Sequence, residues 1–151
     1  MDGLRIVVGS DDAGLQYKEV LRELLEADER VAAVIDVGVA AGEETAYPDV
    51  AVDAARRVAA GEADRALLVC GTGLGVAIAA NKVAGVRAVT AHDSYSVERA
   101  VLSNDAQVLC LGQRVIGVEL ARRLVREWVG HHFDPSSPSA RKVARIVHYD
   151  H

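Results

Sequence analysis

A glycine-rich bend at residues 67–82, LLVCGTGLGVAIAANK, combines residue types that could carry chemistry. An apolar run ends at Cys70, and three glycines follow within five residues, with Thr72 among them. Glycine lets backbone N–H groups crowd around a negative charge. A thiol beside such amides at a helix N-terminus is stabilised as a thiolate. We therefore expect Cys70 to be a catalytic residue next to an anion hole, with a small, buried structural cysteine as the plain alternative.

A nucleotide-binding loop is a second interpretation of CGTGLG at residues 70–75. The dinucleotide fingerprint is GxGxxG after the first strand, whereas this spacing is GxGxG after the third predicted strand. Asp93 does lie about 20 residues downstream, where an acidic residue would bind a ribose hydroxyl. The spacing favours an anion that forms during a reaction over a bound nucleotide.

The elements that position this bend alternate between short apolar runs and longer helical patterns. The predicted strands are Leu4–Val8, Val31–Val37, Arg65–Val69, Val86–Ala91 and Gln107–Leu111. The predicted helices are Gly14–Ala27, Pro48–Ala60, Leu74–Lys82, Ser94–Leu102 and Gly117–Gly130. Continuous apolar runs are typical of parallel strands that are covered on both faces. The pattern predicts an α/β fold, a doubly wound five-stranded parallel sheet whose ligands bind beyond the carboxyl ends of the strands.

Length and composition favour one globular domain over residues 1–151. Half of the 151 residues are apolar, 26% are charged, and the formal net charge is −5, which disfavours nucleic acid and anionic membranes as partners. We find neither an apolar run of about 18 residues nor a basic leader, so we expect a soluble, cytoplasmic protein. The two cysteines, which no CxxC or histidine cluster accompanies, predict neither a disulfide scaffold nor a metal site.

Polar side chains follow several of the predicted strands. Asp11 and Asp12 follow the first strand, where they would either bind a ligand or cap a helix. Arg114 follows the fifth strand, and His92 is the one histidine at the carboxyl end of a strand. We expect Asp11, Asp12 and Arg114 on the side of the crevice in which ligands of such sheets bind, and His92 could reach it if its ring faces that way.

The other candidates have plain structural alternatives. Tyr47 precedes Pro48 and would form a packed turn, and Ser103-Asn104 precedes the fifth strand, where it would be a simple cap. A linker rich in Pro and Ser begins near residue 131, and a basic helix at Ala140–His148 follows it. We expect this helix to reach a neighbouring subunit.

The motifs together resemble one enzyme family along nearly the whole chain. In order they are GSDDAG, YKE, AYPD, VCGTGLGVAIAANK, GVRAV and SNDAQVLCLGQRVIG, followed by the basic helix. This combination resembles the ribose-5-phosphate isomerase B and galactose-6-phosphate isomerase family. The resemblance implies a Rossmann-like fold and a homodimer or tetramer with active sites shared between subunits. It also implies that an aldose phosphate and a ketose phosphate are interconverted without a metal or a cofactor.

The resemblance also implies roles for individual residues. Cys70 matches the catalytic base of the members that use cysteine, whereas other members use a glutamate where this chain has Val76. Thr72 matches a hydroxyl that moves protons between the substrate oxygens. The remaining substrate-binding residues would be Asp11, Asp12, Tyr47, Gly71, Gly73, Leu74, Gly75, Ser103, Asn104, Arg114, Arg141 and Lys142.

Three departures from the family pattern bear on the substrate. Asp12 and Ser103 stand where the family usually has histidines, the second of which is credited with opening the sugar ring. Of two C-terminal arginines of the family, one falls near Pro138 and the other at Lys142, next to Arg141. A tetrose 4-phosphate needs no ring opening, so we expect D-erythrulose 4-phosphate and D-erythrose 4-phosphate as substrates. The alternatives are ribose 5-phosphate, with His92 opening the ring, and a non-catalytic module that binds a sugar phosphate or a nucleotide.

Overall fold

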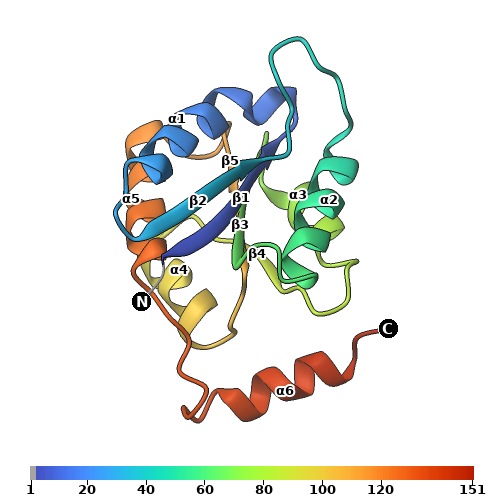
Figure 1. The fold of residues 1–151 in the computed structure, drawn as a ribbon, viewed down its shortest axis with the longest axis vertical. Coiled ribbons are helices and arrows are strands. Elements are labelled where there is room, and N and C mark those ends of the chain that lie inside the picture. Colours follow the sequence, from blue (N-terminus) through green and yellow to red (C-terminus); the bar gives the residue numbers. More distant parts are fainter. Residues whose placement is uncertain (1–2) are drawn as a thin grey trace.

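The computed structural model describes residues 3–151 and shows one parallel sheet with helices on both faces (Figure 1). The strands are β1 (Leu4–Ser10), β2 (Val31–Asp36), β3 (Arg65–Cys70), β4 (Ala88–Thr90) and β5 (Val108–Gly112). They lie in the order β2-β1-β3-β5-β4, with parallel pairing throughout. The strand order reverses between β1 and β3, so the carboxyl ends of these two strands border the crevice in which such sheets bind ligands.

Five of the helices, α1 to α5, cover the two faces of the sheet. The helical elements are η1 (Asp12–Gly14), α1 (Leu15–Glu26), α2 (Tyr47–Ala59), α3 (Leu74–Ala80), α4 (Ser94–Leu102), α5 (Val118–Val129) and α6 (Ala140–His148). One hydrophobic cluster joins α1, α4 and α5 to the sheet, and a second joins α2 and α3 to the opposite face. The expected doubly wound architecture is confirmed.

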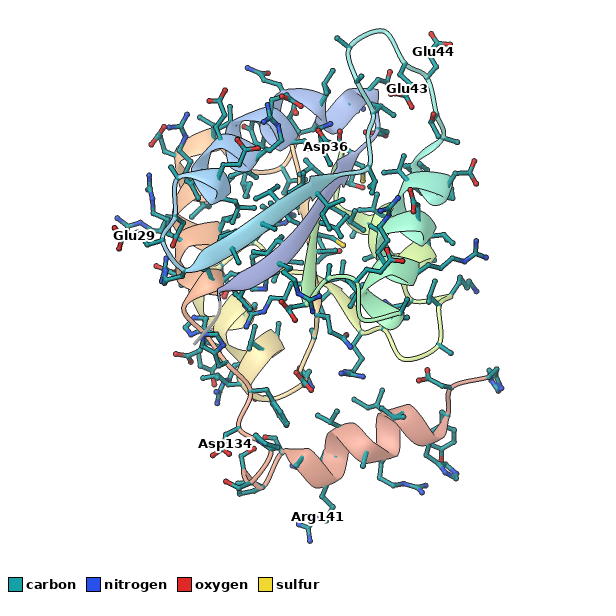
Figure 2. The ribbon with its side chains drawn as sticks, in the orientation of Figure 1. Glu29, Asp36, Glu43, Glu44, Asp134 and Arg141 are labelled. Carbon is teal, nitrogen blue, oxygen red and sulfur yellow. The ribbon has the colours of Figure 1, made fainter. Side chains whose placement is uncertain are left out.

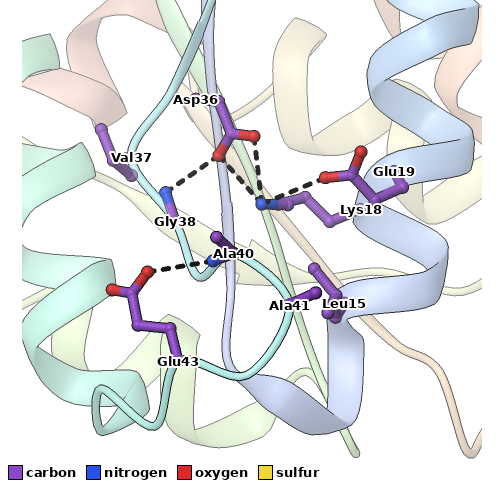
Figure 3. A pocket seen from close by; sticks show the side chains of 9 residues that line it. All are labelled: Leu15, Lys18, Glu19, Asp36, Val37, Gly38, Ala40, Ala41 and Glu43. Carbon is purple, nitrogen blue, oxygen red and sulfur yellow. Dashed lines mark hydrogen bonds and ion pairs between the residues drawn. The ribbon is translucent and has the colours of Figure 1, made fainter.

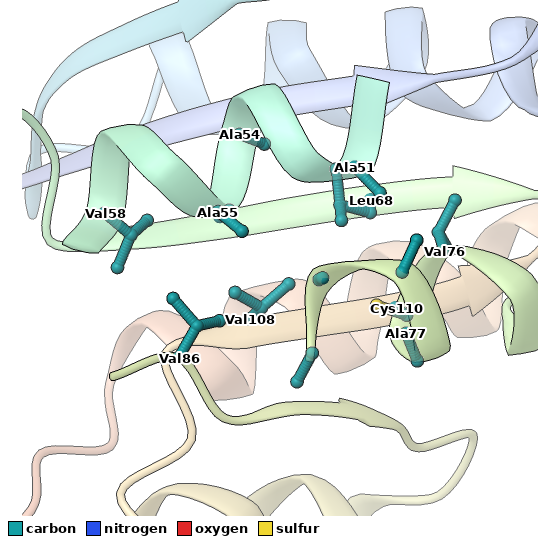
Figure 4. Close-up of a cluster of buried hydrophobic side chains, with 14 of the residues drawn as sticks. Ala51, Ala54, Ala55, Val58, Leu68, Val76, Ala77, Val86, Val108 and Cys110 are labelled. Atoms are coloured by element: carbon teal, nitrogen blue, oxygen red, sulfur yellow. The ribbon is translucent and has the colours of Figure 1, made fainter. Parts of the chain in front are cut away.

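Small side chains bring α2 and α3 close to the sheet (Figure 4). Ala51, Ala54 and Ala55 are fully buried on one side of α2, at the spacing that places residues on a single helix face. They pack with Leu68 of β3 and Val76 of α3. Because an alanine face permits a close approach, α3 is held directly beside the strand that ends in Cys70.

The observed strands agree with the predicted ones to within two residues at each end. All of β3 and β5 is buried, as continuous apolar runs predict for central strands. The edge strand β4 is shorter than the predicted Val86–Ala91, because the N–H of Val86 bonds to Val83 in a turn. The other edge strand, β2, is only partly buried. Within residues 3–151, no helix has both the length and the apolar character needed to cross a bilayer.

Helix α6 lies apart from the helices that cover the sheet, on the side where the strands begin (Figure 1). Val143 is buried, whereas Ile146 and Val147 are 45% and 43% exposed. The carboxylate of Asp150 accepts a hydrogen bond from the N–H of Gly85 at 2.9 Å and ties the end of the chain to the main body. The expected packing of α6 on a partner subunit stays a prediction.

Candidate active site

The bend after β3 places Cys70 at the start of a helix. Cys70 is the last residue of β3 and is 5% exposed. Its Sγ accepts a hydrogen bond from the N–H of Gly73, the N-cap of α3, at 3.1 Å. The backbone amide and the positive end of the helix dipole both stabilise negative charge on this sulfur. The role of Cys70 as a base stays a prediction.

The other amides of the bend differ in their partners. Thr72 is exposed, and its Oγ1 accepts a hydrogen bond from the N–H of Leu74 at 3.2 Å. Two of the amides expected to form the anion hole, those of Gly73 and Leu74, thus donate to side chains of the bend itself. The N–H of Gly75 lies in the first turn of α3, where a helix offers no acceptor, and can meet a substrate oxygen.

Tyr47 packs directly against this helical turn. It is the first residue of α2 and is 40% exposed. A β-carbon placed on Gly75 would lie 2.4 Å from Cε1 of the Tyr47 ring, so only glycine fits beneath the ring. Tyr47 therefore forms a wall of the bend and is more than a packed turn.

Arg114 approaches the bend from β5. Its Nη1 lies 3.3 Å from the point where a β-carbon of Gly71 would be, and its N–H donates to the carbonyl of Gly71 at 3.0 Å. The side chain is exposed, and no carboxylate is recorded as its partner within residues 3–151. A cation placed here suits an anionic group of a ligand bound over the bend.

Of the two acidic residues that follow β1, Asp11 has a structural role as a helix cap. Asp11 is the N-cap of η1, and its Oδ1 accepts a hydrogen bond from the N–H of Gly14 at 3.0 Å. Asp12 is exposed. Gly14 packs against the carbonyl of Val69, so both acids lie beside the end of β3. The capping interpretation of Asp11 is thus correct, and a second role in binding stays a prediction.

His92 follows β4 and binds the backbone of β5. Its Nε2 accepts a hydrogen bond from the N–H of Gly112 at 3.0 Å. Burial lowers the pKa of His92, although the neighbouring Asp93 acts in the opposite direction. The imidazole is therefore neutral near pH 7, with its proton on Nδ1.

The second cysteine has a different environment. Cys110 lies in the middle of β5 and is fully buried. Burial, assisted by the nearby Cys70, raises the pKa of the Cys110 thiol well above its usual range. This thiol stays protonated and unreactive at physiological pH.

A hollow of about 670 Å³ lies at the carboxyl end of β2, beside α1 (Figure 3). Lys18, only 1% exposed, donates to Asp36 at 2.9 Å and 3.1 Å and to the carbonyl of Val39 at 2.6 Å. Glu19 adds a third carboxylate oxygen at 3.4 Å from the ammonium. Because Lys18 is already surrounded by anionic partners, this hollow is poorly suited to a phosphate. We assign it a structural role in holding the segment that leads to α2.

Two predicted site residues lie at the amino ends of the strands, opposite the end where Cys70 lies. Ser103 caps the end of α4, and the carbonyl of Asn104 accepts a hydrogen bond from Arg87, which precedes β4. Cys70 is level with Gly112, four residues along the strands from Val108, which corresponds to about 13 Å. Within one chain, Ser103 and Asn104 are therefore not brought to the bend.

Arg141 and Lys142 are also distant from Cys70. Both are exposed on α6, and Figure 2 shows Arg141 directed away from the sheet. The structure thus divides the predicted site residues into two groups. The first group lies near the carboxyl ends of the strands and consists of Asp11, Asp12, Tyr47, Cys70, Gly71, Thr72, Gly73, Leu74, Gly75 and Arg114. The four at the opposite side are Ser103, Asn104, Arg141 and Lys142.

Comparison with known proteins decides the family. The family described as Ribose/Galactose Isomerase matches residues 6–146. The chain is 68% identical over 148 residues to D-erythrulose-4-phosphate isomerase 2 of Mycolicibacterium smegmatis, with 97% of each chain covered. It is 42% identical over 149 residues to the D-erythrulose-4-phosphate isomerase of Pectobacterium atrosepticum, covering 98% of this chain and 96% of the relative. The chain belongs to the ribose/galactose isomerase family.

A solved structure of the family agrees with this assignment. Ribose-5-phosphate isomerase B of Clostridium thermocellum superimposes with a TM-score of 0.90 at 38% identity, with 96% of each chain covered. The Rossmann-like fold expected from the motifs is thereby confirmed, and so is the expected enzyme class, an aldose–ketose isomerase of sugar phosphates. The roles of single residues remain predictions, because similarity between whole chains assigns no step to a side chain.

Some contacts of this isomerase site were not predicted from the sequence. The Thr90 hydroxyl donates to the carbonyl of Gly73 at 2.6 Å, and His92 holds Gly112. Thr90 could have been selected by the rule that also selected His92, namely a polar residue at the carboxyl end of a strand. No grouping of three or more His, Cys, Asp or Glu in the described chain is arranged to hold a metal ion.

Proposed function

We propose that the chain interconverts D-erythrulose 4-phosphate and D-erythrose 4-phosphate through an enediolate, with Cys70 as the base. The observation that carries the chemistry is the Cys70 sulfur, 3.1 Å from the N–H of Gly73 at the start of α3 and next to Thr72. This reaction requires a base and a preorganised N–H donor for the oxyanion that forms. Cys70 and the N–H of Gly75 would supply both from a single bend of the chain.

The reaction consists of proton transfers. The Cys70 thiolate removes the proton on the carbon next to the carbonyl, and the C–H electron pair forms the C=C bond of an enediolate. The displaced carbonyl electrons stay on the oxygen, where the N–H of Gly75 would stabilise them; losing one such donor typically costs about 10²–10³ in rate. The Thr72 hydroxyl moves a proton between the two oxygens, and Cys70 returns its proton to the adjacent carbon. Atoms and charges balance without a cofactor or a metal.

We propose that the site is completed by a second subunit. Arg114 would bind phosphate from the subunit that supplies Cys70, whereas Arg141 and Lys142 of the other subunit would add positive charge. Ser103 and Asn104 would also come from the other subunit, because within one chain they lie at the wrong edge of the sheet. This arrangement makes a homodimer the smallest active unit, and a tetramer would be a pair of such dimers.

The preference for a four-carbon substrate is inferred from two residues, Ser103 and Asp12. Ser103 has no useful basicity near pH 7, so it cannot replace an imidazole that opens a sugar ring. A tetrose with phosphate on O4 has no free hydroxyl to form a furanose ring and needs no such group. Asp12 would repel a phosphate bound next to it, which fits a shorter substrate with its phosphate elsewhere. Two relatives that are named D-erythrulose-4-phosphate isomerases support this choice.

Ribose 5-phosphate is the alternative substrate, and the similarity to a ribose-5-phosphate isomerase B structure favours it. We expect kcat/KM to be higher for D-erythrose 4-phosphate than for ribose 5-phosphate on one enzyme preparation. A higher value for ribose 5-phosphate would refute the tetrose assignment and leave the family assignment intact. We propose the cytoplasm as the location, since both cysteines are free thiols, as is usual in a reducing compartment.

A further inference from the structure

Three consecutive N–H groups at the carboxyl end of β5, those of residues 112–114, each donate to an acceptor near the Cys70 bend. The N–H of Gln113 donates to the carbonyl of Cys70 at 2.9 Å, and the N–H of Arg114 donates to the carbonyl of Gly71 at 3.0 Å. The first of the three, at Gly112, donates instead to a side chain, the Nε2 of His92, at 3.0 Å. The segment 112–114 is therefore bonded to two carbonyls of the bend and to the imidazole of His92, which follows β4.

The imidazole replaces a missing backbone partner. The parallel ladder between β4 and β5 pairs Thr90 with Cys110 and ends there. Continued by two residues, the same register would bring His92 level with Gly112, but β4 has already ended. Gly112 is buried, so without another partner its N–H would be left without an acceptor, which is unfavourable in the protein interior. His92 supplies that acceptor from its side chain.

The position of Gly112 matters for the reacting groups. A β-carbon on Gly112 would lie 2.6 Å from both the carbonyl carbon and the oxygen of Thr72, so the two backbones are in close contact. A shift of Gly112 would thus move Thr72. It would also move Arg114, whose guanidinium lies over Gly71. A second hydrogen bond from the end of β4 also reaches the bend, from the Thr90 hydroxyl to the carbonyl of Gly73. A threonine hydroxyl does not change its charge with pH, so this bond is independent of pH.

We propose that His92 is a positioning residue of the isomerase, which holds Gly112 and through it Thr72 and Arg114, and that it releases them when it is protonated. The proposal rests on the proposed function and deepens it. Only a neutral imidazole with its proton on Nδ1 has the lone pair on Nε2 that this bond needs. His92 is therefore not a free base for opening a sugar ring, because the nitrogen that would act is already bound to the backbone.

The charges around His92 set the direction of its pH dependence. Burial lowers the pKa of His92, and Asp93 at the N-cap of α4 is the neighbouring charge that raises it. From β5 the ring faces the uncharged Gly112. The neutral form is favoured in the folded protein, so its contribution to stability is present above the ordinary histidine pKa of about 6.5 and is lost as the pH falls. Release of Gly112 is accordingly an effect of acidic pH.

A matched pair of amide variants tests this role. In His92→Gln the side-chain oxygen can reach the place of Nε2, whereas in His92→Asn it reaches only the place of Nδ1. We expect His92→Gln to retain kcat within about threefold of the wild type and His92→Asn to lose tenfold or more, since small misplacements near reacting groups are costly. The wild type should lose kcat/KM progressively as the pH falls below the ordinary histidine pKa of about 6.5, and His92→Gln should not.

A second readout does not depend on catalysis. Long-range ¹H–¹⁵N NMR correlations of the imidazole should show the Nδ1–H tautomer in the wild type at pH 7.5. The control is His132→Gln, which changes the other histidine whose pKa is lowered by burial. This variant should have the kcat of the wild type and the same loss of kcat/KM at acidic pH. Equal activity of the Gln and Asn variants, or an Nε2–H tautomer, would refute the positioning role. If the wild type isomerises neither sugar phosphate while the Nδ1–H tautomer is found, the proposed function fails and the hydrogen bond stands.

Discussion

At the scale of the residue, two cysteines on adjacent strands show how environment determines chemistry. Both are free and both are buried. Cys70 ends its strand, and its sulfur meets the amide of Gly73, whereas Cys110 lies inside the core. Burial raises the pKa of Cys110, so its thiolate is not populated near neutral pH. The contrast makes Cys110 a natural control for Cys70.

Cys70→Ala should abolish turnover and leave substrate binding largely unchanged, because it removes the base but keeps the amides of the bend. We expect kcat to fall by far more than tenfold, the change that corresponds to roughly 1.4 kcal/mol in the barrier. Steady-state kinetics and calorimetric titration with the substrate measure the two effects. Cys110→Ala should stay active. Retention of more than a tenth of the wild-type kcat in Cys70→Ala would exclude Cys70 as the base.

At the scale of the element, sequence patterns predicted the five strands and six α-helices of residues 3–151, but not the short 3-10 helix η1. Continuous apolar runs and helix-terminal residues are local signals. Helix α4 was predicted with the bounds that the structure shows. The Lys18–Asp36 pair and the His92–Gly112 bond were not predicted, since each joins segments whose contact depends on strand order. The placement of Ser103 far from Cys70 likewise follows from the direction of α4, which runs from the carboxyl edge back to the amino edge of the sheet.

Gly75→Ala should disturb the contact between α2 and α3. The new methyl group would lie 2.4 Å from the Tyr47 ring, so the ring must move away from the bend. We expect kcat/KM to fall by about tenfold and the free energy of unfolding by about 1–3 kcal/mol. Enzyme kinetics and urea unfolding measure these effects.

The control for this variant is Gly117→Ala at the N-cap of α5, where a β-carbon meets nothing within 4 Å. It should lower stability by less than about 1 kcal/mol and leave kcat/KM unchanged. If a folded Gly75→Ala enzyme keeps kcat/KM within twofold of the wild type, the position of Tyr47 is unimportant for the reaction.

At the scale of the whole molecule, the basic helix α6 and the Cys70 bend lie at opposite ends of the strands within one chain. Removal of residues 136–151 deletes Arg141 and Lys142, and we expect it to reduce activity at least about a hundredfold if both bind the phosphate. The domain itself should stay folded, since Val143 is the one buried residue of α6. Circular dichroism checks folding, and kinetics measure the loss.

Mixing two inactive chains tests whether the sites are shared. The truncated chain keeps Cys70 and lacks the basic helix, whereas full-length Cys70→Ala keeps the helix and lacks the base. A heterodimer of the two would contain one complete site, so activity should reappear on mixing and refolding. If heterodimers form, as native mass spectrometry would show, and no activity returns, the two subunits do not share their sites.

Isomerisation of D-erythrose 4-phosphate in D₂O tests the enediolate mechanism most directly. A base that holds the proton can exchange it with solvent, so the ketose formed by the wild type should carry deuterium on the carbon next to the carbonyl, detectable by ¹H NMR and mass spectrometry. Cys70→Ala should give neither ketose nor exchange. Ketose formation or exchange that persists in Cys70→Ala would contradict proton transfer by Cys70. If the wild type forms no ketose and shows no exchange with either D-erythrose 4-phosphate or ribose 5-phosphate, the chain is a module that binds a ligand without catalysis.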